Sequence, residues 1–268
     1  MSRLGLIAGN GRFPLLFLEA AKAEGTDIVV VAHEGETPPE IAALMPNITW
    51  IQVGELGKII DTLKAADVTQ AVMAGGISKA GAFAHFQPDE RGMAFISRLP
   101  NLKDDVILRG VAQELENEGI LIIESTRFLS TLVPTAGILT STAPNSQQWD
   151  DIRLGFTVAK EIGRWDVGQS VIIKRGTIIA VEGIEGTSET IRRGGTLAGA
   201  GTIVVKVSKP QQDLRFDVPA VGPETIDIMR EVNAAVLAIE AKRTLMLDKL
   251  QVLERANAAA LCIVALDH

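Results

Sequence analysis

LGLIAGNGRFPLLFLEAAKA, residues 4–23, is the stretch that decides the fold of the first half of the chain. Residues 4–8 form an apolar run, Gly9-Asn10-Gly11 follows it, and residues 13–23 then carry apolar side chains at helical spacing. A strand, a glycine turn and a helix in this order make the first unit of an α/β fold. Because Pro14 suits the first turn of a helix, we predict that the helix begins near residue 13.

Strand and helix patterns alternate from there to about residue 123. We predict strands over residues 28–32, 48–53, 71–74 and 120–123, and helices over residues 56–66 and 103–118. Strands that alternate with helices of this length imply a mainly parallel sheet covered on both faces. The first half is therefore predicted to be a parallel-sheet α/β domain.

A stretch rich in Thr, Ser, Gly and Pro, residues 130–144, separates this pattern from a second one. In the second pattern we predict helices over residues 149–164, 188–193, 224–235 and 247–258, and strands over residues 170–173, 177–181, 202–207 and 261–265. The length of 268 residues suits two domains. We predict an N-terminal domain over residues 1–130, a linker over residues 131–145 and a C-terminal α/β domain over residues 146–268.

Composition restricts the classes of function. The chain has 26 Lys and Arg against 33 Asp and Glu, a net charge of −7, which disfavours nucleic acid as a partner. It has one cysteine, no tyrosine and three histidines without metal-ligand spacing, so a zinc site is disfavoured. A bound metal would have to be held by carboxylates, which favours Mg²⁺ or Mn²⁺. We find neither a signal-peptide pattern nor an apolar run of transmembrane length, and expect a cytoplasmic location.

Two glycine-rich turns follow apolar strands of the first half. Their candidate ligand-binding residues are Gly9, Asn10, Gly11, Arg12 and Phe13 in the first turn, and Gly75, Gly76 and Lys79 in the second. Glycines let the backbone approach a phosphate or sugar, and open α/β sheets bind ligands at the carboxyl ends of their strands. The first turn lacks the third glycine of a dinucleotide fingerprint, so a plain tight turn stays open, and Lys79 could be a solvated loop lysine.

Three further polar positions admit two interpretations each. Asp104 and Asp105 begin a predicted helix, where carboxylates stabilise the helix end but could also face a metal ion. Thr187 follows a glycine-containing loop, and it could either cap the next helix or line a nucleotide or sugar site.

KVSKPQQDLRFDVP, residues 206–219, is the densest cluster of charged side chains. In an extended segment Asp213, Arg215 and Asp217 would all point to one face. They could simply form surface salt bridges. Alternatively, the two aspartates could bind Mg²⁺ while Arg215, Lys206 and Lys209 balance the charge of a phosphate, and we favour this second interpretation.

At these residues the chain resembles the LpxI type of UDP-2,3-diacylglucosamine pyrophosphatase. The resemblance rests on LGLIAGNGRFP, MAGGISK, LKDDVILR, AVEGIEGT, KVSKPQQDLRFDVPAVGPETI and IEAKRTLMLD, which occur in the family's order over nearly the whole chain. Two positions depart from the family pattern: Ser188 stands where an acidic residue is expected, and a glycine is expected within residues 240–243.

The resemblance implies a Rossmann-like N-terminal domain, followed by a C-terminal α/β domain. It also implies Mg²⁺-dependent hydrolysis of UDP-2,3-diacylglucosamine to UMP and 2,3-diacylglucosamine 1-phosphate (lipid X) in lipid A biosynthesis. Asp213, Arg215 and Asp217 become the candidate catalytic residues, and the two aspartates, with Asp104 and Asp105, the candidate metal ligands. The implied location is the cytoplasmic surface of the inner membrane of a Gram-negative bacterium, and a homodimer is left open.

The sequence leaves three alternative functions open. An NAD(P)-linked oxidoreductase would use the first glycine turn, with Glu34 near the end of the second strand to bind ribose. A non-catalytic nucleotide-sugar binding protein would bind the same ligand without releasing UMP. A structural scaffold would leave the charged segment over residues 206–219 unexplained.

Overall fold

The computed structural model describes residues 3–78 and 86–267, and the chain divides into two compact units. The first unit consists of Met1–Ser130 together with Asp213–Asp217, and the second of Thr131–Gln212 together with Val218–His268. Both units are α/β, so the predicted fold class is confirmed. The short segment Asp213–Asp217, which lies far along the chain, belongs to the first unit, although the sequence pattern assigns it to the C-terminal half.

The first unit is built on a five-stranded sheet with the order β3-β2-β1-β4-β5. The strands are β1 (Leu4–Ala8), β2 (Ile28–His33), β3 (Ile48–Ile51), β4 (Gln70–Ala74) and β5 (Leu121–Ile122). Every pairing in this sheet is parallel. The carboxyl ends of β1, β2 and β4 therefore lie at one edge, which brings the loops after them together.

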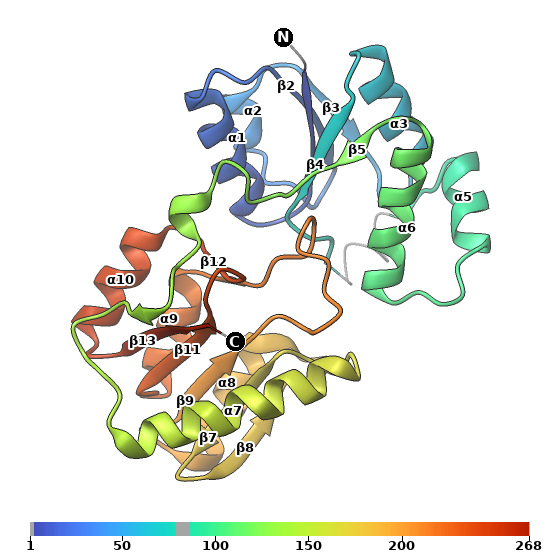
Figure 1. The fold of residues 1–268 in the computed structure, drawn as a ribbon. Helices are drawn as coiled ribbons and strands as arrows, with labels where there is room; N and C mark the ends of the chain where they lie inside the picture. Colours follow the sequence, from blue (N-terminus) through green and yellow to red (C-terminus); the bar gives the residue numbers. More distant parts are fainter. Residues whose placement is uncertain (1–2, 79–85, 268) are drawn as a thin grey trace. The chain divides into compact units, whose positions relative to one another are not determined.

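Helices cover both faces of the first sheet (Figure 1). They are α1 (Phe13–Ala23), α2 (Ile41–Leu44), α3 (Leu56–Ala65), α5 (Glu90–Ser97) and α6 (Asp104–Asn117). Figure 1 shows α1 and α2 on one side of the strands and α3 and α6 on the other. Buried side chains of α3 and α6, including Leu63 and Leu115, form a core with the sheet, and Phe216 of the distant segment packs in the same core.

The second unit contains a six-stranded sheet with the order β6-β13-β11-β9-β7-β8 and a two-stranded sheet of β10 and β12. The strands are β6 (Gly137–Ile138), β7 (Ser170–Lys174), β8 (Thr177–Val181), β9 (Ile203–Lys206), β10 (Ala220–Val221), β11 (Val236–Glu240), β12 (Leu245–Met246) and β13 (Cys262–Leu266). β9, β11 and β13 are parallel to one another, whereas β6, β7 and β8 pair antiparallel with their neighbours. The carboxyl ends of the three parallel strands form one edge.

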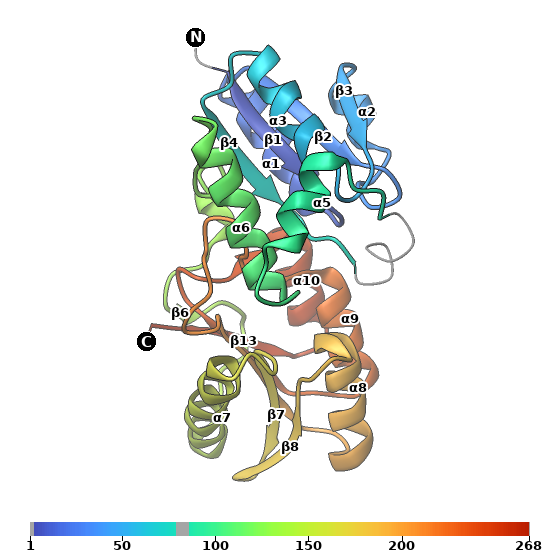
Figure 2. The ribbon, with the colours of Figure 1, turned by 90° about the vertical axis from the view of Figure 1, so that its right-hand side faces the viewer.

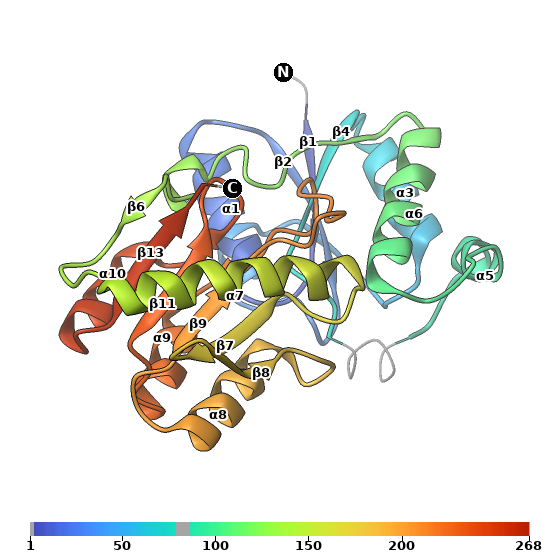
Figure 3. The ribbon, with the colours of Figure 1, turned by 60° about the horizontal axis from the view of Figure 1, so that its bottom comes forward.

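Four α-helices complete the second unit: α7 (Ser146–Arg164), α8 (Gly186–Ala198), α9 (Pro223–Glu231) and α10 (Lys249–Ala258), and a 3₁₀ turn, Ser130–Leu132, lies at the junction of the units. Figure 2 shows α7 on one side of β7 and β8 and α8 on the other, and Figure 3 shows α7 lying across the strands. Two apolar clusters match this arrangement. One joins α7 to the sheet, and the other joins α8, α9 and α10 to the opposite face.

Several sequence predictions differ from the structure. Residues 224–235 were predicted as one helix, but α9 ends at Glu231, Asn233 takes a positive φ of 51°, and β11 follows. The apolar run of β11 was missed because periodicity alone cannot separate a short buried strand from a helix. α5 was also missed, and part of the predicted linker is strand β6, which pairs with β13.

Candidate functional site

The two glycine turns predicted to bind a ligand meet at the carboxyl edge of the first sheet. The Gly9 amide donates to the Ala74 carbonyl at 2.8 Å, and the Asn10 amide donates to the Gly76 carbonyl at 2.7 Å. The Gly76 amide in turn donates to the Asn10 side-chain oxygen at 3.3 Å. The turns after β1 and β4 are thus joined by their own backbone groups.

This contact explains one of the glycines without any ligand. A Cβ atom added to Gly9 would lie 2.3 Å from the Gly76 oxygen, so no larger residue fits between the two turns. A Cβ atom on Gly76, by contrast, would have only the Asn10 side-chain oxygen near it, at 3.5 Å, and Gly76 is exposed. The backbone of the second turn is therefore the part that an external ligand could approach.

A polar network surrounds the joined turns, and its centre, Glu36, was not among the predicted site residues. The Glu36 carboxylate accepts hydrogen bonds from the Asn10 side chain at 2.9 Å and from both the amide and the hydroxyl of Ser78 at 2.8 Å. Burial raises the pKa of Glu36, but these hydrogen bonds outweigh it and the pKa is lowered. Glu36 was missed because it lies in a loop, distant in sequence from both turns.

His33 and Thr37 hold the end of β1 from the neighbouring strand. The His33 ring nitrogen Nδ1 lies 2.8 Å from the Ala8 carbonyl oxygen, to which the Thr37 hydroxyl also donates at 2.7 Å. Burial lowers the pKa of His33, so its neutral form is favoured. His33 therefore holds the carboxyl end of β1, and Gly9 is the next residue after that strand.

The other residues predicted in these turns are placed differently. Arg12 is exposed directly before α1, whereas the Phe13 side chain is buried in the first unit and only its backbone could meet a ligand. Lys79 lies outside the described residues. The ligand roles of Arg12, Phe13 and Lys79 stay predictions.

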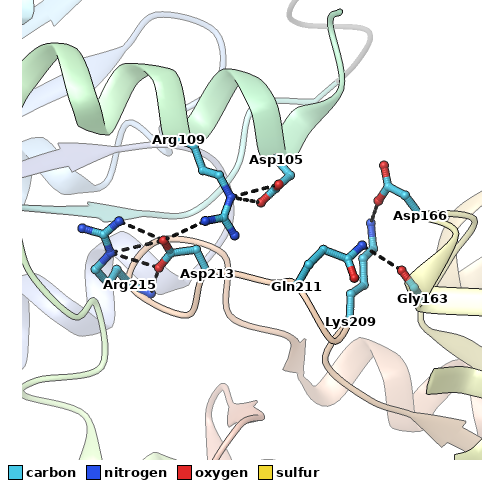
Figure 4. Close-up of polar contacts among 8 residues, drawn as sticks. All are labelled: Asp105, Arg109, Gly163, Asp166, Lys209, Gln211, Asp213 and Arg215. Atoms are coloured by element: carbon cyan, nitrogen blue, oxygen red, sulfur yellow. Dashed lines mark hydrogen bonds and ion pairs between the residues drawn. The ribbon is translucent and has the colours of Figure 1, made fainter. Parts of the chain in front are cut away.

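Figure 4 shows the charged segment Asp213–Asp217 against α6 of the first unit. Arg215 binds both carboxylate oxygens of Asp213, at 3.0 Å through Nε and 2.9 Å through a terminal nitrogen, and its other terminal nitrogen binds Glu116 at 2.9 Å. Arg109 lies 3.5 Å from Asp213 and 2.9 Å from Asp105. Acidic and basic groups alternate through this network, so each charge has a partner of opposite sign.

The predicted extended conformation of this segment is wrong. The Asp217 amide donates to the Asp213 carbonyl at 3.0 Å, so the chain makes one tight turn and the three charged side chains do not share a strand face. The turn forms because the Phe216 side chain is buried in the core of the first unit and the Ser125 amide binds the Arg215 carbonyl at 3.0 Å. Hydrogen bonds from Arg215 lower the pKa of Asp213, which keeps it ionised.

Asp104 and Asp105 both lie in the first turn of α6. Neither caps the helix with a side-chain hydrogen bond, and Asp105 instead pairs with Arg109 one turn later. Asp105 therefore belongs to the charged network. Among the described residues, no hydrogen bond or ion pair links the Asp104 side chain to it.

The residues that flank the segment are anchored in the second unit, as Figure 4 also shows for Lys209 and Gln211. Lys209 pairs with Asp166 at 2.5 Å, and the Gln211 side chain donates to the Gly163 carbonyl at 2.9 Å. Lys206 is buried and donates to the Ala220 carbonyl at 2.9 Å, which joins the two ends of the loop. Its predicted phosphate contact would have to compete with this bond.

Thr187 lies in the first turn of α8, where its hydroxyl donates to Glu182 at 3.0 Å. It therefore links that helix to the end of β8 and Glu182, which is buried. Its predicted contact with the substrate stays a prediction.

The fit of a metal ion can be judged from the carboxylates. Both oxygens of Asp213 already accept from Arg215, and a cation there would compete with two arginines. In the described part of the chain, no three His, Cys, Asp or Glu side chains gather as a metal site. These residues do not fit a metal held by the protein alone, although Mg²⁺ often binds through one or two carboxylates plus the phosphates of a substrate.

Comparison with known proteins was decisive for the family. The model of the LpxI N-terminal domain matches residues 3–132, and that of the LpxI C-terminal domain matches residues 135–264. The chain belongs to the LpxI family. It is 31% identical to UDP-2,3-diacylglucosamine pyrophosphatase LpxI of Caulobacter vibrioides, over 100% of this chain and 98% of the relative. The family resemblance stated from the sequence motifs is confirmed.

Solved structures add no further argument. The biotin carboxylase domain of a thermophilic 2-oxoglutarate carboxylase is 15% identical, with a TM-score of 0.29 over 66% of this chain and 36% of that chain. Phosphoribosylglycinamide synthetase from Anaerococcus prevotii is 15% identical, with a TM-score of 0.25 over 69% of this chain and 40% of that chain. Among the described residues, no helix combines the length and apolar character needed to cross a membrane.

Proposed function

We propose that this member of the LpxI family hydrolyses the pyrophosphate of UDP-2,3-diacylglucosamine to UMP and lipid X, as a step of lipid A biosynthesis. The observation that carries the proposal is the end-to-end match to a relative named for this activity, with both family domains in order. The charged segment over residues 206–219, the densest cluster of charged side chains in the sequence, is proposed to supply the residues for the chemistry.

The proposed division of roles follows from the contacts of the segment. Arg215 is held by Asp213 and Glu116, and the pair Asp213–Arg215 thereby fixes the turn on which Asp217 lies. We assign Asp217 to the reacting groups, where it would accept the proton of the attacking water or hold a cation. Pyrophosphate cleavage requires mainly positioning and neutralisation of charge, so a rigid turn with arginines beside it suits the reaction.

We propose that Mg²⁺ enters with the diphosphate, because the described carboxylates do not make a metal site on their own. Asp217 and Asp213 are the proposed protein ligands, and Asp105 is a further candidate through its place in the same network. A bound Mg²⁺ would neutralise phosphate charge in this reaction. Removal of divalent cations is therefore expected to abolish turnover.

The substrate carries two acyl chains, and their exposure to water is costly at about 0.8 kcal/mol per CH₂ group. We therefore propose that the protein works in peripheral contact with the cytoplasmic surface of the inner membrane. Sedimentation with vesicles tests this part, and light scattering tests whether the chain forms a homodimer.

The direct test is incubation of the purified chain with UDP-2,3-diacylglucosamine, with Mg²⁺ and with EDTA, followed by identification of the products by mass spectrometry. UMP and lipid X are expected with Mg²⁺ and neither product with EDTA. Binding of the nucleotide sugar without release of UMP under either condition would instead make this chain a non-catalytic binding protein.

A further inference from the structure

A second set of charged side chains lies at the carboxyl edge of the sheet in the second unit. Glu240 is the last residue of β11, and it is only 1% exposed. It binds the Lys160 ammonium of α7 at 2.9 and 2.8 Å and accepts from the amide and hydroxyl of Ser208, at 2.8 and 2.7 Å. Burial raises the pKa of Glu240, but the Lys160 and Ser208 hydrogen bonds outweigh it and lower the pKa.

A cavity of about 560 Å³ opens beside Glu240. It is lined by Glu240, Ala241, Lys242, Arg243 and Asp267, which follow the parallel strands β11 and β13. The carboxyl ends of parallel strands are where open α/β sheets bind ligands. The cavity therefore has the position of a binding site, and residues 240–243 of its wall lie within IEAKRTLMLD, one of the motifs on which the family resemblance rests.

Arg243 is the cation in this cavity with binding capacity left. Its Nε lies 3.6 Å from Glu240, beyond hydrogen-bond distance, and its side chain is 47% exposed. Within the described part of the chain, this guanidinium makes no other ion pair or side-chain hydrogen bond. Glu240 is already satisfied by Lys160 and Ser208, so it can orient Arg243 without occupying the guanidinium's remaining donors.

Lys242, by contrast, is committed to Asp267, with its ammonium 3.1 Å from the carboxylate. The charged side chains that line the cavity sum to zero, and the Lys160 ammonium bound to Glu240 gives the cluster as a whole a net charge of +1. A guanidinium with an open fork of donors matches the oxygens of a phosphate or a carboxylate, and a phosphate is the group that the proposed reaction supplies.

We propose that Arg243 binds the phosphate of a phosphomonoester, in a site built by Glu240 and Lys160. The inference rests on the proposed function for its ligand class, because pyrophosphate hydrolysis yields two phosphomonoesters, a nucleotide and a sugar 1-phosphate. Ser208 connects the site to the reaction: it is held by Glu240 at the start of the loop that leads to the Asp213–Asp217 segment.

The test measures binding without turnover. Inorganic phosphate, UMP and lipid X in detergent micelles are titrated calorimetrically into the wild-type protein and into Arg243→Gln and Arg243→Lys. Loss of a bidentate charge-assisted contact is expected to weaken binding of at least one of UMP and lipid X by about 10- to 100-fold in Arg243→Gln. Arg243→Lys keeps the charge but not the fork and should restore only part of this loss.

Arg153→Gln is the control. Arg153 is exposed on α7 of the same unit, pairs with Asp150 and is not among the residues that line the cavity, so its substitution should leave phosphate binding unchanged. Weakened UMP binding assigns the site to the nucleotide phosphate, and weakened lipid X binding assigns it to the sugar phosphate.

The proposal is overturned if Arg243→Gln binds all three probes like the wild type, or if the wild type binds none of them. Because no turnover is measured, the result is separate from the test of hydrolysis. A wild type that releases UMP while Arg243→Gln keeps full affinity would refute this inference alone.

Discussion

The carboxyl edges of the two sheets are constructed in different ways. In the first unit, the turns after β1 and β4 are joined by backbone hydrogen bonds and by the absence of a side chain at Gly9. In the second unit, the edge is held by a buried ion pair, Lys160–Glu240. A glycine-rich turn in a sequence thus indicates close backbone approach, and the partner in that approach can be another part of the same chain.

The largest expected effect tests the dependence of the second edge on charge. Lys160→Met leaves Glu240 buried without its cation and should lower the free energy of unfolding by about 3–5 kcal/mol, as loss of one partner of a buried pair does. Urea denaturation measures the change. Arg153→Met, which breaks the exposed Arg153–Asp150 pair on the same helix, is the control and should cost at most about 1 kcal/mol. Equal losses in the two variants would contradict the account of the second edge.

A middle-sized effect tests the backbone contact of the first edge. Gly9→Ala places a Cβ atom 2.3 Å from the Gly76 oxygen and should cost about 1–3 kcal/mol of stability through overpacking. Gly76→Ala meets only ordinary contact distances and should change stability by no more than about 0.5 kcal/mol. Thermal and urea unfolding measure the stability of both variants. A Gly9→Ala variant as stable as the wild type would show that the two turns are not packed as described.

The smallest effect concerns the one carboxylate at the centre of the first edge. Glu36→Gln should cost about 1 kcal/mol at neutral pH, because hydrogen bonds from Ser78 and Asn10 favour the charged form. The folded-state pKa of Glu36 is lowered, so its contribution is present above the unfolded pKa of about 4.3 and is lost as the pH falls through the folded value. Urea unfolding at several pH values should show the two proteins converging in acid. A difference that stays constant down to low pH would exclude this electrostatic origin.

These two edges also show how far the sequence could be read. The strands of the first unit and the helices α1, α3 and α6 were predicted from their apolar patterns, and α1 begins at Phe13 as predicted, whereas α2 and α5 were missed. β11 was not separated from the helix predicted before it, because the apolar residues continue from Ala234 to Ile239 without a glycine or proline between them. With β11 missed, Glu240 could not be placed at a strand end, although it lies in a motif of the family resemblance.

The charged segment was singled out by its composition as a candidate site, and its conformation differs from the extended one that was expected. Alternation of Asp213, Arg215 and Asp217 suggested an extended strand, whereas burial of Phe216 in the first unit forces a tight turn. Packing against residues about 100 positions earlier, such as Glu116, is a long-range contact that local pattern cannot reveal. The pairing of Asp213 with Arg215 follows from the turn.

The most direct test of the proposed hydrolysis is the rate of UMP release by Asp217→Asn, measured beside the wild type with Mg²⁺ present. The substitution keeps the size of the side chain and removes the charge, so kcat should fall by about 100-fold or more while the melting temperature stays close to that of the wild type. Release of UMP by a folded Asp217→Asn at close to the wild-type rate would contradict the assignment of this residue to the reacting groups.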